Sequence, residues 1–330
     1  MSELRAVHLV IRPGLPPTAG NAVTAARLAR LVRLAGVTVH LHTADALPTA
    51  RPGPGEVVHA LNAVYAGRAA LRWASGAPVI WTFTGTDSEP RELDLVAPAL
   101  DETFALLVYQ HEQQVRLERV RSDLAGRVRL VPPGVSMPRP VPPPPDDGPI
   151  SFLLPAGLRP VKGPDLALET VEAVVAAGLP ARLQIAGPAR DADFAQTFLV
   201  RAAASGLADY LGEVPHRRMG SVYGQAHIIL NTSSVEGISN ALLEGMAAGR
   251  AVLATDIPGN RAALRHDVDG WLASDATFPA AALELARDAG LRQRLAREAR
   301  RSVQARFSVQ AEARAHLELY RAAAAGGELP

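Results

Sequence analysis

Short apolar runs alternate with longer stretches of helical character along the whole chain, and this alternation limits the fold to an α/β architecture. A strand, a helix and a further strand form the unit from which parallel sheets are built. The pattern therefore predicts parallel sheets in both halves of the chain. The expected strands are 7–11, 37–42, 57–61, 79–83, 105–109 and 128–131 in the first half, and 150–155, 181–186, 210–211, 227–230 and 251–254 in the second.

A proline-rich break separates the two halves. Residues 137–149 read MPRPVPPPPDDGP, and prolines at this density stiffen the chain and prevent regular structure. The 330 residues are enough for two domains. We predict an N-terminal Rossmann-like domain over 1–137, a linker over 138–149 and a C-terminal Rossmann-like domain over 150–330, whose last helix, 309–324, returns toward the first domain. Two such doubly wound domains would face each other across a ligand-binding cleft.

The composition argues against several classes of protein. The net charge of +1 gives no reason to expect a nucleic acid or an anionic membrane as partner. With no cysteine, the chain has no disulfide, no thiolate metal site and no cysteine nucleophile. No run of about 18 apolar residues predicts a membrane span, and the N-terminus lacks the layout of a signal peptide, so we expect a cytoplasmic protein. The histidines show no paired metal-ligand spacing, so no metal is predicted, and nothing indicates the oligomeric state.

A strand, a short polar loop and the start of a helix follow one another in the segment 231–260. The helix is expected to begin near Ser239 or Asn240, both of which are favourable N-cap residues. The unpaired N–H groups and the partial positive charge at a helix start suit a phosphate group. Gly237 would let the backbone approach a ligand closely. The segment thus predicts a ligand loop at the N-terminus of a helix.

Two carboxylates flank this helix start. Glu236 lies in the loop, and Glu244 follows eight residues later among the apolar residues of the helix. A carboxylate in such surroundings is costly to bury unless it is hydrogen-bonded, and vicinal sugar hydroxyls could supply those bonds. The alternative is that Glu236 is an ordinary loop charge and Glu244 a solvated helix charge.

The loop after the first strand of the second domain, 157–163, contains Gly157, Arg159 and Lys162, the only lysine in the chain. Ligands of doubly wound sheets bind beyond the carboxyl ends of the strands, so both cations would project toward the helix start at Ser239. Two cations and a helix N-terminus would make a diphosphate site. The alternatives are two surface charges on a turn and the survival of a single lysine by chance.

The first domain offers weaker signals. The loop after its first strand ends with Gly20 and Asn21 at a helix start, and it lacks the GxGxxG pattern, so a nicotinamide dinucleotide site has no support. Gly20 could let the backbone approach a phosphate or sugar, and a helix cap with a flexible loop is the alternative. The loop after the fourth strand contains Thr84, Thr86 and Asp87. The last two would face the cleft, although Asp87 could equally be an N-cap.

These motifs together resemble the glycosyltransferases of family 4, whose GT-B fold consists of two facing Rossmann-like domains. The resemblance covers most of 150–325 and is closest to the glycosyltransferase-1-domain-containing group of that family. The first domain is also similar to bacterial selenosugar synthases, with which it shares the GN-x-VTA-x-R and TGTD patterns. The features that carry the resemblance in the second domain are the Arg159/Lys162 loop, Gly187-Pro188, residues 212–215 and the E-x7-E pair of Glu236 and Glu244.

The resemblance implies a retaining glycosyltransferase that transfers a hexosyl unit from a nucleotide-diphosphate sugar, most often a UDP-sugar, to a small soluble acceptor. The nucleotide sugar is a co-substrate, and no metal or other cofactor is implied. Arg159 and Lys162 would hold the diphosphate and stabilise the leaving group, and Glu236 would contact the donor sugar, which makes these three the implied catalytic residues. Glu244 would bind the ribose hydroxyls, and Thr84, Thr86 and Asp87 would lie on the acceptor or sugar side. The implied donor-binding residues are Gly20, Asn21, Gly157, Gly187, Val214, Gly237, Ile238, Ser239, Asn240 and Glu244.

Two positions depart from the family pattern. Thr84 stands where many relatives carry a histidine that contacts the donor sugar, and Arg250 occupies a place where proline is common, which we interpret as a turn variant. Alternatives therefore stay open. They are a selenosugar synthase-like transfer to selenophosphate, a nucleotide-sugar-binding protein without turnover, and a nucleotide-sugar 2-epimerase, which the E-x7-E pair with Arg159 and Lys162 fits less well.

Overall fold

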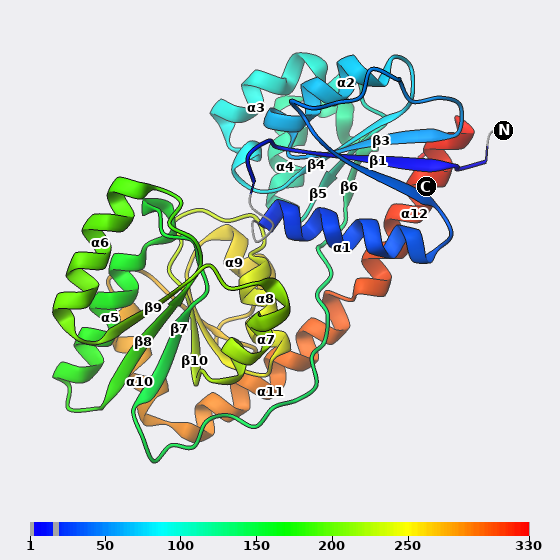
Figure 1. The fold of residues 1–330 in the computed structure, drawn as a ribbon. Helices are drawn as coiled ribbons and strands as arrows, with labels where there is room; N and C mark the ends of the chain where they lie inside the picture. Colours follow the sequence, from blue (N-terminus) through cyan, green and yellow to red (C-terminus); the bar gives the residue numbers. More distant parts are fainter. Residues whose placement is uncertain (1–2, 16–19, 330) are drawn as a thin grey trace. The chain divides into compact units, whose positions relative to one another are not determined.

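The structure is a computed structural model that describes residues 3–15 and 20–329 (Figure 1). The chain divides into two compact units. Unit 1 comprises Met1–Gly134 and Val309–Pro330, and unit 2 comprises Val135–Ser308. In the part of the chain that the structure describes, no helix is both long enough and apolar enough to cross a membrane.

Unit 1 contains a six-stranded parallel sheet in the order β2-β1-β3-β4-β5-β6. Its strands are β1 (Ala6–Ile11), β2 (Thr38–Thr43), β3 (Glu56–Leu61), β4 (Val79–Phe83), β5 (Ala105–Val108) and β6 (Val128–Leu130). The strands predicted for the first half are all present, with ends that differ by at most one residue. The sheet grows outward from β1 in both directions, because β2 lies on one side of it and β3 on the other.

Helices cover both faces of this sheet (Figure 1). On one face, Leu28 of α1 and Tyr320 of α12 pack with Leu9. On the other face, α2, α3 and α4 pack with Val10 and Trp81. Neighbouring strand residues thus face opposite helices, since side chains alternate along a strand. The bounds are α1 (Gly20–Leu34), α2 (Arg68–Ala74), α3 (Pro90–Val96), α4 (His111–Val120) and α12 (Val309–Ala325), with shorter turns η1 (Ala63–Gly67), η2 (Thr86–Ser88), η3 (Ala97–Glu102) and η4 (Ser122–Arg127).

The C-terminal helix α12 belongs to unit 1, because its polar residues bond to other elements of that unit. Nε and Nη2 of Arg27 in α1 each donate to Glu312 at 2.9 Å, and the Glu312 side chain is 1% exposed. The hydroxyl of Tyr320 lies 2.7 Å from Nδ1 of His59, whose Nε2 lies 2.6 Å from the Thr82 hydroxyl. The predicted boundaries had counted this helix with the second domain, from which it would return toward the first. The contacts group it with unit 1.

Unit 2 contains a second six-stranded parallel sheet, in the order β12-β11-β10-β7-β8-β9. The strands are β7 (Ile150–Leu154), β8 (Ala181–Ala186), β9 (Ala208–Gly212), β10 (Ile228–Asn231), β11 (Ala251–Thr255) and β12 (Trp271–Ala273). The five predicted strands are present. β12 was not predicted, because its apolar run has only three residues, which is too short to stand out in the sequence.

The helices of unit 2 also cover both faces of their sheet. Leu168 of α5, Phe198 of α6 and Leu285 of α10 share one core with Ile228 of β10. The next strand residue, Ile229, faces α8, where a Cβ on Gly245 would lie 2.9 Å from it. The bounds are α5 (Pro164–Ala176), α6 (Ala192–Ser205), α7 (His216–Gly224), α8 (Asn240–Ala247), α9 (Pro258–Ala263), α10 (Phe278–Arg287) and α11 (Ala289–Arg306), with the short turn η5 (Pro160–Lys162).

The proline-rich segment packs along unit 2, which begins at Val135. Nη2 of Arg250 donates to the carbonyl oxygens of Val141 and Pro142 at 3.0 and 3.1 Å. Proline lacks an N–H group, but its carbonyl remains an acceptor. Arg250 is only 1% exposed. It is therefore more than a turn variant, because it holds the predicted linker, 138–149, against the second unit.

Replacing Glu312 with glutamine should destabilise the fold, because the change leaves the Arg27 guanidinium in a largely buried position without its counter-charge. Removing one partner of a buried ion pair costs about 3–5 kcal/mol. Urea denaturation followed by circular dichroism would measure the loss. The matched control Glu298→Gln removes an exposed pair with Arg301 and should cost less than ~1 kcal/mol. Equal losses for the two variants would contradict the role of the Arg27–Glu312 pair.

Candidate functional site

In each sheet the strand order reverses beside the first strand. In unit 2 this point lies between β7 and β10, since the chain adds β8 and β9 on one side of β7 before it returns to form β10 on the other. Ligands of open α/β sheets bind outside the carboxyl ends of the strands at such a point. The loops that follow β7 and β10 are 155–163 and 232–239, the two segments in which the sequence predicted cations and a carboxylate.

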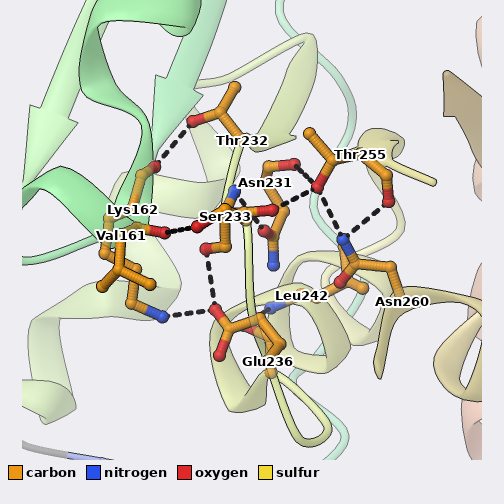
Figure 2. A network of polar contacts seen from close by, with 11 residues as sticks. Val161, Lys162, Asn231, Thr232, Ser233, Glu236, Leu242, Thr255 and Asn260 are labelled. Carbon is orange, nitrogen blue, oxygen red and sulfur yellow. Dashed lines mark hydrogen bonds and ion pairs between the residues drawn. The ribbon is translucent and has the colours of Figure 1, made fainter. Parts of the chain in front are cut away.

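An ion pair joins these two loops (Figure 2). Nζ of Lys162 contacts Oε1 of Glu236, and the two side chains are 16% and 13% exposed. The same carboxylate oxygen accepts a hydrogen bond of 2.9 Å from the hydroxyl of Ser233. The only lysine of the chain is thus held beside Glu236, so the structure brings together two of the three residues predicted to be catalytic.

The third of these residues, Arg159, is the N-cap of the short turn η5 that contains Lys162. Its side chain is exposed, and within the described residues it has neither a hydrogen bond nor an ion pair. Arg159 therefore presents an unpaired cation on the same loop as the paired ammonium of Lys162.

Backbone contacts hold the two loops in register. The Ser234 N–H donates to the Val161 carbonyl at 3.0 Å. The Thr232 hydroxyl donates to the Lys162 carbonyl at 2.9 Å (Figure 2). The next residue, Gly163, has a φ of 56°, and a Cβ there would lie 2.2 Å from the Thr232 carbonyl oxygen. Only glycine allows this approach, so it sets the position from which Lys162 reaches Glu236.

The start of α9 supports the Glu236 loop from its other side. The hydroxyl of Thr255 donates to the Ser233 carbonyl at 2.6 Å, and Nδ2 of Asn260 donates to the Thr255 carbonyl at 2.9 Å (Figure 2). A Cβ on Gly259 would lie 2.0 Å from the carbonyl oxygen of Gly237. The loop is therefore packed on both sides and keeps a defined shape.

Helix α8 begins where the sequence predicted it, directly after this loop. Ser239 is the N-cap, and its hydroxyl accepts a hydrogen bond from the N–H of Leu242. The loop residues Gly237 and Ile238 lead into Ser239, and Asn240 is the first helical residue. N–H groups in the first turn lack partners within the helix, and the helix dipole adds a partial positive charge there. The Lys162–Glu236 pair thus lies beside a helix start that favours an anion.

The second carboxylate, Glu244, is bonded to the neighbouring helix α7. Its oxygens accept hydrogen bonds from the Tyr223 hydroxyl at 3.0 Å and meet Nε2 of His216 at 2.9 Å. The Glu244 side chain is 18% exposed, so the structure does not support a freely solvated charge. Burial raises the pKa of Tyr223 well above its ordinary value, so this phenol keeps its proton and donates to Glu244. Val214, predicted to lie near the nucleotide base, is two residues before His216.

Gly157 and Gly187 lie where the loops after β7 and β8 touch. A Cβ on Gly187 would lie 2.2 Å from the Ala156 carbonyl oxygen, and one on Gly157 would lie 2.9 Å from Cγ of Arg190 and 3.2 Å from the Pro188 carbonyl oxygen. Both positions therefore need glycine for packing between the loops. Gly157 lies two residues before Arg159, so this packing holds the beginning of the loop that carries Arg159.

The predicted residues of unit 1 form a separate cluster around Thr84. Gly20 is the first residue of α1, and Nδ2 of the next residue, Asn21, donates to the Thr84 hydroxyl at 3.2 Å. Nδ2 of Asn62 donates to the same oxygen at 3.3 Å. The side chain of Thr86 lies outside the described residues. The hydroxyl of Thr84, where many relatives carry a histidine, is thus an acceptor for two amides.

Asp87 braces its own loop. It is 1% exposed, and its oxygens accept from the N–H groups of Thr84 and Gly85 at 2.8 Å each and of Ala63 at 2.9 Å. This geometry corrects the expectation that Asp87 faces a ligand. The bonds resemble those of an N-cap, the alternative that the sequence left open. Two of them stay within the loop after β4, and the third joins this loop to Ala63, the first residue of η1. Burial raises the pKa of Asp87 to about 6.

Several residues that shape the site carried no signal of their own in the sequence. His216 and Tyr223 are seven residues apart and so lie on one face of α7, but nothing local says that this face meets Glu244. Thr255 likewise acts through a bond to the Ser233 carbonyl, 22 residues away. Among the described residues, no group of three or more histidine, cysteine, aspartate or glutamate side chains is arranged to hold a metal ion.

Comparison with known proteins agrees with this geometry. The two units, each a parallel six-stranded sheet flanked by helices, form the GT-B fold that was predicted. Residues 150–288 match the family described as "Glycosyl transferases group 1", and the match includes both loops of the site. A curated relative, glycosyltransferase 1 domain-containing protein 1 of Xenopus tropicalis, is 34% identical over 101 residues. That alignment covers 30% of this chain and 29% of the relative, so the matched part spans less than a third of either protein.

Solved structures share the fold over nearly the whole chain. Sucrose-phosphate synthase from Thermosynechococcus elongatus has a TM-score of 0.81 at 18% identity, covering 98% of this chain and 100% of that one. HepE from Anabaena, in complex with UDP and glucose, has a TM-score of 0.75 at 14% identity, covering 95% and 98%. A glycosyltransferase from Rickettsia africae has a TM-score of 0.76 at 16% identity, covering 97% and 98%. Identities this low establish the fold and leave the substrate open.

The buried Asp87 should make the stability of the protein depend on pH. The folded state raises the pKa of Asp87 from its ordinary 3.8 to about 6, so folding favours the protonated form. The stabilisation is complete below pH about 4 and is lost as the pH rises through about 6. Asp87→Asn lacks this titration, so the stability of the wild type relative to the variant should fall by about 3 kcal/mol between these limits. Urea denaturation at several pH values would measure the difference, and a difference that does not vary with pH would contradict the assignment.

Proposed function

We propose that the chain is a glycosyltransferase that transfers a hexosyl unit from a nucleotide-diphosphate sugar, with UDP as the favoured nucleotide, to a small soluble acceptor. The observation that carries the proposal is the Lys162–Glu236 ion pair, which lies at the point of strand reversal and beside the start of α8. The family match of residues 150–288 supports the class of reaction. HepE, a structural neighbour, was solved in complex with UDP-glucose, which favours UDP here by analogy.

The diphosphate would bind to the cations of the loop after β7. Arg159 is exposed and unpaired among the described residues, so its guanidinium can accept a phosphate without losing a partner. Lys162 is a compact point charge, and a bound phosphate would share its ammonium with Glu236. The first-turn N–H groups of α8 add further donors.

The second carboxylate is suited to the ribose. Glu244 is an acceptor held in place by Tyr223, and a ribose offers two vicinal hydroxyl donors. His216 is 55% exposed, so it can leave Glu244 when a ribose takes its place. Tyr223 then acts as a positioning residue, because it touches Glu244 and orients the carboxylate toward the nucleoside.

In the proposed reaction the bond between the anomeric carbon and the diphosphate oxygen breaks while an acceptor hydroxyl attacks from the same face, which retains the anomeric configuration. The acceptor proton passes to the departing phosphate oxygen, and the products are the glycoside and the nucleoside diphosphate. Negative charge grows on the leaving group, so Arg159, Lys162 and the helix start would supply most of the catalysis. Glu236 would contact the donor sugar beside the reacting carbon. The proposal involves neither a metal nor another cofactor.

Lys162→Ala should slow the turnover of a proven donor by about 10²- to 10³-fold, or ~2.7–4 kcal/mol in the barrier, because one preorganised donor to the leaving group is lost. The donor is first found by thermal-shift screening with UDP-, GDP- and ADP-sugars, since a ligand at about 100 times its dissociation constant stabilises the fold by ~2.7 kcal/mol. Release of the nucleoside diphosphate from that donor then measures turnover.

The matched control for this test is Arg182→Ala, which removes an exposed cation paired with Asp209 far along the sheet at β8–β9. It should leave both binding and turnover unchanged. Intact turnover in Lys162→Ala would overturn the catalytic assignment. The absence of a thermal shift with all three classes of nucleotide sugar would overturn the proposed function itself.

Glu244→Gln should weaken binding of UDP about tenfold or more, because a charge-assisted hydrogen bond to the ribose is lost. Tyr223→Phe should weaken it a few-fold, because the carboxylate loses its positioning bond of 3.0 Å. Isothermal titration calorimetry would measure both.

Inorganic pyrophosphate provides the control ligand for these two variants, since it has no ribose. Its affinity should stay unchanged in Glu244→Gln and Tyr223→Phe and should fall in Lys162→Ala. An equal loss for UDP and pyrophosphate in Glu244→Gln would place Glu244 away from the ribose.

The substitution of Thr84 for a family histidine favours a second candidate, a nucleotide-sugar-binding protein without turnover. Its hydroxyl accepts bonds from Asn21 and Asn62, and a hydroxyl in this position lacks the donor reach of an imidazole. Binding of a UDP-sugar without release of UDP, with or without added acceptors, would select this candidate. Transfer to selenophosphate, suggested by the resemblance of the first domain to selenosugar synthases, would appear as turnover that depends on selenophosphate.

A further inference from the structure

A cavity of about 440 Å³ lies in unit 2 at the opposite end of the sheet from the candidate site. It is formed by the proline-rich segment over 140–146, by residues that precede or begin β10 and β11, and by α11 from Ala289 to Arg300. Because the strands are parallel, these amino ends lie at the edge away from the loops that hold Lys162 and Glu236. The volume is within the range of small-molecule sites. We name this space the linker cavity.

The charges around the linker cavity are unbalanced. Its lining includes Arg250, Arg292, Arg297 and Arg300, and the one acidic residue in that lining is Asp146. Asp146 forms an ion pair with Arg292. The other three arginines are without a carboxylate among the cavity-lining residues, so the cavity carries a positive charge.

Among these cations, Arg250 has the largest free-energy cost of removal from water, because it is the most deeply buried. It is 1% exposed, and its guanidinium bonds only to backbone carbonyls, including those of Tyr223 at 3.1 Å and Val141 at 3.0 Å. Among the described residues its Nη1 has no hydrogen-bond partner. A buried charge without a counter-ion destabilises a fold, and a nearby anion would reduce that cost. Burial also lowers the pKa of Arg250, which expresses the same penalty.

His227 adds a second buried donor. The N–H of Ser151 donates to Nδ1 of His227 at 2.9 Å, so this nitrogen carries no proton. The proton of the neutral ring must therefore be on Nε2, which has no hydrogen-bond partner in the described part of the chain and lies 3.6 Å from Asp146. Burial lowers the pKa of His227, which favours this neutral form. The lining thus contains a buried Arg250 nitrogen without an acceptor and, close to it in the same lining, a neutral His227 whose Nε2 lies beside Asp146.

The remaining lining residues include one accessible cation and several apolar side chains. Arg297 is exposed and has no bond within the described residues, so its guanidinium is available to a ligand. Pro140, Pro143 and Pro144 form an apolar side from the proline-rich segment, and Ala296 adds to it from α11.

We propose that the linker cavity binds a small ligand that carries a phosphate or carboxylate group, with the oxyanion at the arginines and an apolar part against the prolines. Guanidinium groups match both oxyanions in geometry, and the anion would supply the counter-charge that Arg250 lacks. Because the proline-rich segment lines the cavity, an occupied site would hold that segment on unit 2. The proposal is independent of the donor site, which lies at the other edge of the sheet.

Thermal unfolding at constant ionic strength tests the proposal with inorganic phosphate and phenyl phosphate as probes. All proteins carry Lys162→Ala, so that phosphate at the donor site contributes little. Arg297→Gln should raise the dissociation constant of phosphate about tenfold, because it removes one charge-assisted contact. Arg297 is exposed and unpaired, so this variant should fold normally. Phenyl phosphate should bind about tenfold more tightly than phosphate, because its ring is buried against the prolines.

Arg301→Gln is the matched control, since Arg301 lies on the same helix, is 73% exposed and is not part of the cavity lining. It should leave both dissociation constants unchanged. Equal effects of Arg297→Gln and Arg301→Gln, or a linear rather than saturable dependence on phosphate, would overturn the site. Equal affinities for phosphate and phenyl phosphate would overturn the apolar part of the proposal.

Discussion

The candidate site depends on the close approach of the two loops that follow β7 and β10. The parallel sheet brings the ends of these strands to one edge. Gly163 lets the loop after β7 lie against the Thr232 carbonyl of the loop after β10, and Gly259 lets the start of α9 lie against the Gly237 carbonyl of that second loop. The Lys162–Glu236 ion pair can then form between segments 74 residues apart.

Unit 2 uses its two sheet edges differently. At the carboxyl edge Lys162 is paired with Glu236, and Arg159 is exposed. At the amino edge the arginines outnumber the carboxylates, and Arg250 is buried with backbone acceptors only. Arginine can occupy such positions because its delocalised charge is weakly hydrated and its fork bonds to several carbonyls at once. The same residue type is therefore an exposed cation at one edge and a packing element of the linker at the other.

Most of the fold could be predicted, because strands that are buried on both faces appear as continuous apolar runs. The helix starts at Asn240 and Val309 were predictable for a related reason, since caps and turn residues act on their immediate neighbours. β12 escaped prediction because it is short. That the loops of Lys162 and Glu236 meet followed from a topological rule, which states where strand ends lie. The ion pair between the two side chains was not predicted, because the rule does not say which side chains touch.

The amino-acid order alone was enough to indicate two parallel sheets, the polar loop before α8 and the types of side chain at the carboxyl edge. These features depend on periodicity and on contacts between near neighbours. The tertiary structure decided which partner each charge received. Glu244 is held by a tyrosine from α7, Asp87 accepts a hydrogen bond from the N–H of Ala63, and Arg250 holds the proline-rich segment. Such partners come from distant parts of the chain and meet only when whole helices and strands pack together. The local sequence around a charged residue therefore does not predict them.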